Sequence, residues 1–241
     1  GPENVLFING DDPLLATVQG NTPFPVISYG LGEACDYRAE KIQSDEKGTS
    51  FLLLHEGLEL PVFIPAFGIH MVYNALAAVA AAEYAGIHPQ KAAAALAEYR
   101  PLAMRQQRYE SGGVTIIDDS YNASPDSMLG GIDVLCAMQV SGRRVAVLAD
   151  MLELGEVSAE AHRSVGRRCA QRKVDVLFAI GEESREMAKA AAELSPQMDC
   201  RWFPDNAGAL AALKELVQPG DAVLVKGSRG MHTDEIVQGL L

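Results

Sequence analysis

From residue 114 to the C-terminus, short apolar runs alternate with longer stretches of helical spacing. The apolar runs cover residues 114–118, 144–149, 174–180 and 222–226. Helices are expected near residues 127–138, 159–171, 183–194 and 207–217. A run that is apolar throughout suits a strand buried on both faces, and such strands alternate with helices in parallel sheets. This half of the chain is therefore predicted to be a Rossmann-like α/β domain with a parallel-rich sheet.

The first half of the chain has shorter and less regular segments. Residues 5–9 and 26–29 are short apolar runs, each typical of a buried strand. Residues 36–64 alternate between apolar and polar positions. Within them, residues 50–55 and 60–64 are joined through a Glu-Gly pair, which predicts an antiparallel hairpin.

Two helices are predicted to follow this hairpin. The Ala-rich stretch 70–85 is almost wholly apolar, which favours a helix buried on most sides. A second helix is expected over residues 89–99, with Pro89 in its first turn and Pro101 beyond its end. The change of pattern near residues 105–109 marks the predicted domain boundary, so that the two domains cover residues 1–106 and 107–241.

The composition disfavours some classes of partner. Charged residues give a formal net charge of -12, from 32 acidic and 20 basic residues. Such a field repels polyanions, so nucleic acid and anionic membrane surfaces are not expected partners. The sequence has no basic and apolar leader, and no apolar run reaches the roughly 18 residues that span a bilayer. We therefore expect a cytoplasmic chain without membrane insertion, and the start without methionine favours a fragment of a longer protein.

The four cysteines are widely spaced along the chain, at Cys35, Cys136, Cys169 and Cys200. No pair has the two-residue separation typical of zinc or redox sites, and the pattern is too sparse for a disulfide framework. Buried free thiols are the favoured interpretation.

The most informative polar segment follows the predicted strand over residues 114–118. Asp118, Asp119, Ser120, Tyr121 and Asn122 crowd the end of this strand. Ligands of open α/β sheets bind at the carboxyl ends of strands. A turn with a helix cap explains the residues that follow, but it does not explain two aspartates directly after an apolar strand. These residues are therefore predicted to belong to a functional site.

Two more strands end in polar residues. The last strand ends in Lys226, and Ser228 and Arg229 follow it. Two cations and a hydroxyl at this position favour an anion site over a solvated turn. Acidic residues of the segment 150–156 follow another strand. His162, one helix beyond, is either a wall of the same cleft or a structural histidine.

Three further residues are weaker candidates on their own. His70 and Asn74 are four residues apart and share one face near a helix N-terminus, where they could meet a ligand, cap the helix or fill core hydrogen bonds. Arg105 lies at the predicted domain boundary, and its planar guanidinium suits phosphate. The alternative for Arg105 is an ordinary surface residue of a linker.

The ordered set of these segments resembles the Mur ligase family. The set comprises G-x-H-x-x-x-N-A-L-A-A at residues 68–78, Arg105, D-D-S-Y-N-A-x-P-x-S at 118–127, D-M-L-E-L-G at 150–155 and K-G-S-R-x-M at 226–231. The N-x-D-D-P segment at residues 9–13 is also similar to the central domain of these ligases, so the resemblance covers nearly the whole chain.

The resemblance implies an ATP-dependent, ADP-forming amide ligase of peptidoglycan synthesis. The sequences of residues 119–123 and 226–229 are similar to those of family members that add D-alanyl-D-alanine to UDP-N-acetylmuramoyl-tripeptide. These members act through an acyl phosphate, with Mg²⁺ as a cofactor. By position, the cofactor-binding residues would be His70 and Asn74 at the adenine end, Arg105 at phosphate, Asp119 at ribose, and Tyr121 and Asn122 nearby. Lys226, Ser228 and Arg229 would hold the dipeptide or the acyl substrate, and Arg105 and Lys226 would be the catalytic residues.

Two departures from the family pattern stand out. Met71 occupies the position after the histidine where the family usually has asparagine, and no G-x-x-x-x-G-K-[ST] phosphate loop occurs in these 241 residues. The segment most similar to this motif, residues 45–50, has its lysine before the glycine and not after it. The family carries its phosphate loop and magnesium ligands upstream, so no metal ligand is predicted here, and an inactive C-terminal fragment of a ligase is expected.

Three alternatives remain open. A folylpolyglutamate-type ligase shares the general architecture of the Mur ligases. It is not expected to carry the sequences found here at Ser120–Asn122 and Lys226–Ser228. A nicotinamide-dependent oxidoreductase needs a G-x-G-x-x-G turn after a strand, which this sequence lacks. A non-catalytic module that binds nucleotide or peptide would need no phosphate loop.

Overall fold

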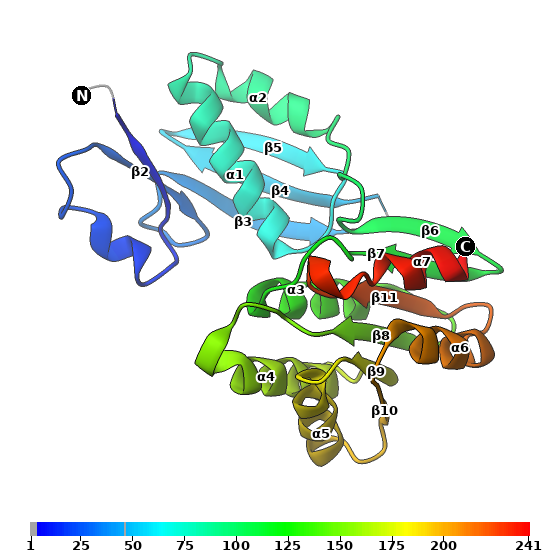
Figure 1. Ribbon diagram of the computed structural model, residues 1–241. Helices are drawn as coiled ribbons and strands as arrows, with labels where there is room; N and C mark the ends of the chain where they lie inside the picture. Colours follow the sequence, from blue (N-terminus) through cyan, green and yellow to red (C-terminus); the bar gives the residue numbers. More distant parts are fainter. Residues whose placement is uncertain (1–3, 46) are drawn as a thin grey trace. The chain divides into compact units, whose positions relative to one another are not determined.

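The computed structural model describes residues 4–45 and 47–241 (Figure 1). Residues 1–3, on which the prediction of a fragment partly rests, and Glu46 of the segment 45–50 lie outside the described residues. The chain folds into two compact units, of which the first ends at Arg100 and the second begins at Pro101. The domain boundary predicted between residues 106 and 107 lies slightly further along the chain and stays a prediction.

The first unit is built on a mixed five-stranded sheet. Its strands run in chain order, as β1 (Leu6–Asn9), β2 (Val26–Gly30), β3 (Tyr37–Ser44), β4 (Thr49–His55) and β5 (Leu58–Ile64). The first three strands pair in parallel and the last three are antiparallel. A short 3-10 helix, η1 (Leu15–Val18), lies between β1 and β2. The two early strands predicted from apolar runs are therefore confirmed.

The predicted hairpin is formed by β4 and β5. His55 pairs with Leu58 across the turn, and the two residues between them, Glu56 and Gly57, have φ values of 45° and 79°. Positive φ at both central residues is the geometry of a type I′ turn, whose twist matches that of the flanking strands. Glycine at the second position adopts it without steric cost.

Helices α1 (Ile69–Tyr84) and α2 (Pro89–Leu96) cover one face of this sheet (Figure 1). Val72, Leu76 and Val79 recur at helical spacing along α1 and are fully buried with strand residues such as Leu53 and Ile64 in one apolar cluster. Both predicted helices are confirmed, although α2 stops short of residue 99. The backbone there changes to i→i−3 hydrogen bonds before the proline at 101.

A polar cluster ties two strands of the first unit to α1. The Tyr37 hydroxyl donates to Glu83 Oε2 at 2.5 Å, and His55 Nε2 lies 3.3 Å from the same oxygen. The rings of Tyr37 and His55 stack with centroids 3.8 Å apart. Burial, together with the hydrogen bond to the Glu83 carboxylate, raises the pKa of Tyr37. The phenol therefore stays protonated and remains a donor at neutral pH.

The second unit holds a six-stranded sheet of predominantly parallel strands. The strands are β6 (Gln107–Ser111), β7 (Val114–Asp118), β8 (Arg144–Ala149), β9 (Val176–Ile180), β10 (Asp199–Phe203) and β11 (Ala222–Lys226). Their order across the sheet is β10-β9-β8-β11-β7-β6, and only β6 is antiparallel to its neighbour. The predicted parallel-rich α/β fold is confirmed.

Helices cover both faces of this second sheet. They are α3 (Pro125–Ala137), α4 (Ser158–Gln171), α5 (Ser184–Leu194), α6 (Asn206–Leu216) and α7 (Asp234–Leu240). Leu213 of α6 and Ile236 of α7 pack with Phe178 and Val223 on one face. On the other face, α3 packs against β11 beside Leu224. Helix α4 contacts α3, and α5 in turn contacts α4. The four predicted helices are confirmed within a few residues.

Among residues 4–45 and 47–241, none of the helices has the length and apolar character needed to cross a membrane.

All four cysteines are free, as expected, but only Cys169 is fully buried. Cys35, Cys136 and Cys200 are half-buried, which corrects the expectation of four buried thiols. Cys200 lies on β10, an edge strand that is covered less than the central strands.

We predict that the carboxylate of Asp221 is a major stabiliser of the second unit. Asp221 is 3% exposed and accepts hydrogen bonds from the backbone N–H groups of Arg143 at 2.8 Å and Gln218 at 3.0 Å. The Arg143 guanidinium adds a contact of 2.7 Å. Burial acts to raise the pKa of Asp221, but these hydrogen bonds outweigh it and the pKa is lowered. Asp221→Asn is expected to cost about 2 kcal/mol at pH 7.

The pH dependence follows from the sign of this shift. An aspartate with a lowered pKa stabilises the fold above its unfolded pKa of about 3.9, and that contribution is lost as the pH falls through the folded pKa. Urea unfolding of the chain and of Asp221→Asn should therefore converge on acidification. Asp199→Asn is the control, because its ion pair with Arg201 is exposed and is expected to contribute below about 1 kcal/mol. An Asp221→Asn deficit that stays constant from neutral to acidic pH would contradict the prediction.

Candidate active site

The loop after β7 combines a tight turn with a helix cap. Asp118 Oδ1 accepts hydrogen bonds from Ser120 N at 3.2 Å and from Ser120 Oγ at 2.5 Å. Ser124 caps α3, because its hydroxyl accepts from Ser127 N while Ser127 Oγ accepts from Ser124 N. Pro125 occupies the first helical turn. Capping therefore explains the end of this loop, as expected from the sequence.

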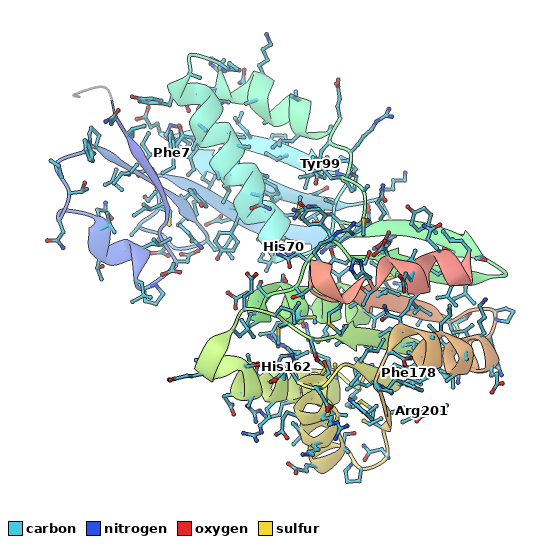
Figure 2. The ribbon with its side chains drawn as sticks, in the orientation of Figure 1. Phe7, His70, Tyr99, His162, Phe178 and Arg201 are labelled. Carbon is cyan, nitrogen blue, oxygen red and sulfur yellow. The ribbon has the colours of Figure 1, made fainter. Side chains whose placement is uncertain are left out.

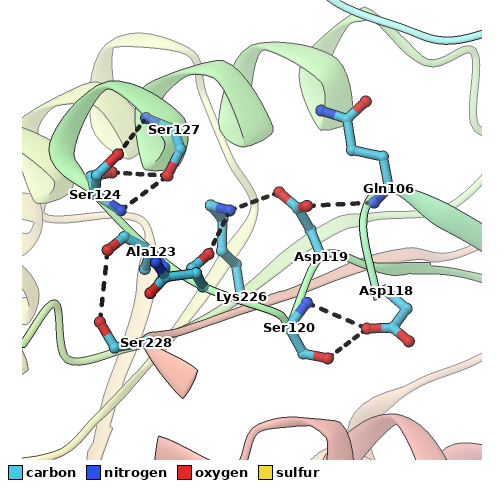
Figure 3. A network of polar contacts seen from close by, with 10 residues as sticks. Gln106, Asp118, Asp119, Ser120, Ala123, Ser124, Ser127, Lys226 and Ser228 are labelled. Atoms are coloured by element: carbon cyan, nitrogen blue, oxygen red, sulfur yellow. Dashed lines mark hydrogen bonds and ion pairs between the residues drawn. The ribbon is translucent and has the colours of Figure 1, made fainter. Parts of the chain in front are cut away.

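Asp119 has a different role from its neighbours in the loop. Its Oδ2 lies 2.7 Å from Nζ of Lys226, and its Oδ1 accepts from the backbone N–H of Gln106 at 3.2 Å (Figure 3). Lys226 Nζ also donates to the Asn122 carbonyl at 2.9 Å. The side chains of Asp119 and Lys226 are 11% and 4% exposed. Strands β7 and β11 are neighbours, so their carboxyl ends bring these two predicted site residues together.

Ser228 links the end of β11 to the segment after β8, the other neighbour of β11. Its backbone N–H donates to the Asp150 carbonyl at 3.1 Å, and its hydroxyl accepts from Leu152 N at 2.9 Å. The hydroxyl also lies 3.5 Å from the Ala123 carbonyl (Figure 3). Three predicted segments thus meet at Ser228, and its buried hydroxyl is engaged within the protein.

His162 supports this edge of the sheet from within α4 (Figure 2). The ring is fully buried, with Nδ1 2.8 Å from the Ser158 carbonyl and Nε2 3.0 Å from Met151 N. A carbonyl can only accept, so Nδ1 carries the proton and Nε2 accepts, which is the neutral form. The neighbouring Asp150 carboxylate accepts from Ser184 N at 2.7 Å and caps α5. These contacts support the structural alternative for His162.

Two arginines bring exposed positive charge to the same part of the second unit. The Arg105 guanidinium carbon lies 4.1 Å from the centroid of the Tyr121 ring, a cation–π distance. The backbone N–H of Tyr121 donates to the Met104 carbonyl at 3.0 Å. Arg229 is 55% exposed and lies 3.7 Å from Asp234. Because both guanidinium groups reach solvent, they remain available for an anionic ligand.

His70 and Asn74 belong to the first unit. They lie in the first two turns of α1, after Gly68, which has a φ of 95°. Figure 2 shows His70 at the start of this helix. His70 is half-buried and Asn74 is exposed, with its amide 3.7 Å from Met71 Sδ. The predicted shared helix face is therefore present.

Two contributors to this part of the second unit were not predicted from the sequence. Gln106 takes part through its backbone N–H, which no side-chain pattern signals. Gly131 lies inside α3 where a Cβ atom would come 3.4 Å from Lys226 Cδ and 3.7 Å from Asp119 Oδ2. A glycine within a predicted helix is the signal that could have identified this close approach.

The described residues contain no group of three or more His, Cys, Asp or Glu side chains placed to hold a metal ion. The polar groups that do converge are those at the carboxyl ends of β7, β8 and β11. In open α/β sheets this edge is where ligands bind.

The second unit is therefore an α/β domain with its polar groups gathered at one edge of the sheet. Two family models match the chain, the Mur ligase glutamate ligase domain over residues 104–229 and the Mur ligase middle domain over residues 1–82. The first of these covers more than half of the chain. The chain belongs to the Mur ligase family.

Individual members of that family are similar to nearly the whole of this chain. The UDP-N-acetylmuramoyl-tripeptide–D-alanyl-D-alanine ligase of Bacillus subtilis is 35% identical over 240 residues, which are 99% of this chain and 51% of that protein. A crystal structure of MurF from Acinetobacter baumannii has a TM-score of 0.88 and 29% identity, over 100% of this chain and 52% of that one.

MurF from Thermotoga maritima in complex with ADP has a TM-score of 0.83 and 22% identity, over 99% of this chain and 53% of that one, and shows the shared fold. The chain spans about half the length of the curated relatives that it matches.

Proposed function

We propose that this chain is part of an ATP-dependent, ADP-forming ligase that joins D-alanyl-D-alanine to UDP-N-acetylmuramoyl-tripeptide in peptidoglycan synthesis. The observation that carries the proposal is the meeting of the segments 118–127 and 226–231 at the ends of neighbouring strands, through Asp119 and Lys226. The activity for which the Bacillus subtilis relative is named supports the choice of substrates. Residues 1–106 and 107–241 would be parts of the ATP-binding central domain and the C-terminal domain.

The reaction would proceed in two steps. A carboxylate oxygen of the tripeptide attacks the γ-phosphorus of ATP, which forms an acyl phosphate and releases ADP. The dipeptide amine then attacks the acyl carbon, the bond to phosphate breaks, and the amine loses a proton as the amide forms. Positioning and stabilisation of negative charge are the main contributions that a protein makes to such steps.

We assign the proposed roles of individual residues from the exposure of their side chains and from the family resemblance. Arg105 would reach ATP phosphate, and Arg229 would hold the carboxylate of the dipeptide, because both guanidinium groups are accessible. Asp119 would accept from the ribose hydroxyls. His70 and Asn74 would lie at the adenine end of the nucleotide.

Magnesium would neutralise phosphate charge in the complete enzyme. The described residues do not form a site that fits the ion, so its ligands are proposed to lie elsewhere in the complete enzyme. The cytoplasmic location stays a prediction.

The proposal predicts which substrates release ADP. The complete enzyme that contains this chain should release ADP with ATP, UDP-N-acetylmuramoyl-tripeptide and D-alanyl-D-alanine together, because the dipeptide amine must resolve the acyl phosphate. A coupled ADP assay with each substrate omitted in turn tests this requirement. A parallel reaction with a folate and glutamate is the control, and a preference for the folate pair would overturn the assignment.

A second prediction concerns the ring under Arg105. Tyr121→Leu in the complete enzyme should raise the apparent KM for ATP about two- to fivefold, because an exposed cation–π contact contributes about 0.5–1 kcal/mol. Tyr121→Phe keeps the ring and should retain most of the ATP use. Initial rates at varied ATP compare the two variants. Equal effects of leucine and phenylalanine would show that the ring does not position Arg105.

A further inference from the structure

Lys226 is buried more completely than a substrate-binding lysine would be. Its side chain is 4% exposed, and its ammonium donates to Asp119 Oδ2 at 2.7 Å and to the Asn122 carbonyl at 2.9 Å. Lysine is almost never fully buried unless it is paired. An ammonium that contacts a diffusible substrate must reach solvent, whereas this one is directed at the loop after β7 (Figure 3).

The helix that packs over this pair leaves room for it. Gly131 lies in the interior of α3, where glycine costs about 1 kcal/mol relative to alanine. A Cβ atom at this position would lie 3.3 Å from Leu224 Cδ2 and 3.4 Å from Lys226 Cδ. The contact with Leu224 would be tighter than usual, and the contact with the lysine stem would be at the lower limit of van der Waals distance. The glycine therefore allows the lysine and its carboxylate partner to lie directly against the helix.

The carboxylate that Lys226 holds also fixes the backbone around Arg105. Asp119 Oδ1 accepts from Gln106 N, and the Met104 carbonyl accepts from Tyr121 N. Gln106 and Met104 have φ values of 51° and 62°, a left-handed conformation that is unfavourable for residues other than glycine. Such backbone persists where surrounding contacts hold it. Arg105 lies between these two residues, so both sides of its backbone are tied to the loop after β7.

We propose that Lys226 is a positioning residue for nucleotide use and not a contact for the dipeptide. It neutralises Asp119 and holds its carboxylate toward Gln106, and through that hydrogen bond it sets the backbone that carries Arg105. The proposal rests on the proposed function, and it assigns Lys226 a different role from the catalytic, substrate-holding one that the family resemblance implied. Arg229, further along the same segment and exposed, keeps its proposed role toward the dipeptide.

The test separates nucleotide use from dipeptide use in the complete enzyme. Lys226→Met keeps most of the stem and removes the ammonium, so the apparent KM for ATP should rise about tenfold or more while that for D-alanyl-D-alanine changes less than about twofold. Arg229→Met is the matched comparison, because it removes a cation three residues away that is exposed. It should raise the KM for the dipeptide and leave that for ATP nearly unchanged.

Lys226→Met leaves a buried carboxylate without its cation, and this change could prevent folding. A second variant keeps the proposal testable in that case. The double variant Lys226→Met/Asp119→Asn removes both charges, and its KM for the dipeptide should still match that of the unmodified enzyme. A rise in the dipeptide KM equal to or larger than the rise for ATP, in either variant, would overturn the positioning role. If the unmodified enzyme ligates no D-alanyl-D-alanine, the proposed function fails instead, so the two failures are distinct.

Discussion

Replacing Asp119 by alanine in the complete enzyme is expected to raise the apparent KM for ATP about ten- to a hundredfold. Hydrogen bonds to a charged group contribute about 1.5–3 kcal/mol, and each 1.4 kcal/mol corresponds to a factor of ten. The variant loses the proposed ribose acceptor and also the partner of Lys226 and of Gln106 N. Initial rates with ATP and with dipeptide varied separately measure the effect, which should be smaller for the dipeptide.

This substitution is also expected to destabilise the second unit by about 3 kcal/mol, because it leaves the Lys226 ammonium buried without a carboxylate. Urea unfolding should therefore precede the kinetic assays. Asp126→Ala is the control, because Asp126 lies in the exposed first turn of α3, in the same segment. An Asp119→Ala enzyme that is folded and has an unchanged dependence on ATP would remove this residue from the nucleotide site.

The second large effect is expected for the 241-residue chain by itself. It should fold, because both of its sheets have covered apolar faces, but it should release ADP no faster than a blank reaction. Its sequence contains no G-x-x-x-x-G-K-[ST] phosphate loop, and the γ-phosphate therefore lacks the backbone cradle that such a loop provides. Circular dichroism and a coupled ADP assay with magnesium and all substrates measure the two properties. Sustained turnover by the purified chain, free of host ligase, would show that its ATP site had been misplaced.

The same preparation tests the edge of the first sheet. β1 is the outermost strand of that sheet, and Leu14, in the segment that follows it, is 78% exposed. An unpaired strand edge favours association through backbone hydrogen bonds. Sedimentation velocity should therefore show self-association that increases with concentration. A monomer over the whole concentration range would contradict this expectation.

The parts of the fold that could be predicted are those with a strong local pattern. Strands β7, β8, β9 and β11 are buried along nearly their whole length, so they appear in the sequence as continuous apolar runs. β6 and β10 lie at the two edges of the sheet and are only partly buried. Charged residues such as Arg108 and Arg201 interrupt them, and neither strand was predicted. The short helix α7 was missed because seven residues give little periodicity.

The candidate site was predictable as a set of residues but not as a geometry. Polar residues after apolar strands identified Asp119, Lys226 and Ser228, because parallel strands end at one edge. The pairing of Asp119 with Lys226 depends on β11 lying between β7 and β8, and no local pattern gives this non-sequential order. The contribution of Gln106 depends on a left-handed backbone at a residue that is not glycine, which sequence propensity disfavours.

The most direct test of the proposed function is the mass of the product. The complete enzyme, incubated with ATP, magnesium, UDP-N-acetylmuramoyl-tripeptide and D-alanyl-D-alanine, should form one new species. Its mass should equal the sum of the tripeptide and dipeptide substrates less one water, with one ADP released for each product molecule. ADP formation without that species, or a product that contains an amino acid in place of the dipeptide, would contradict the assignment.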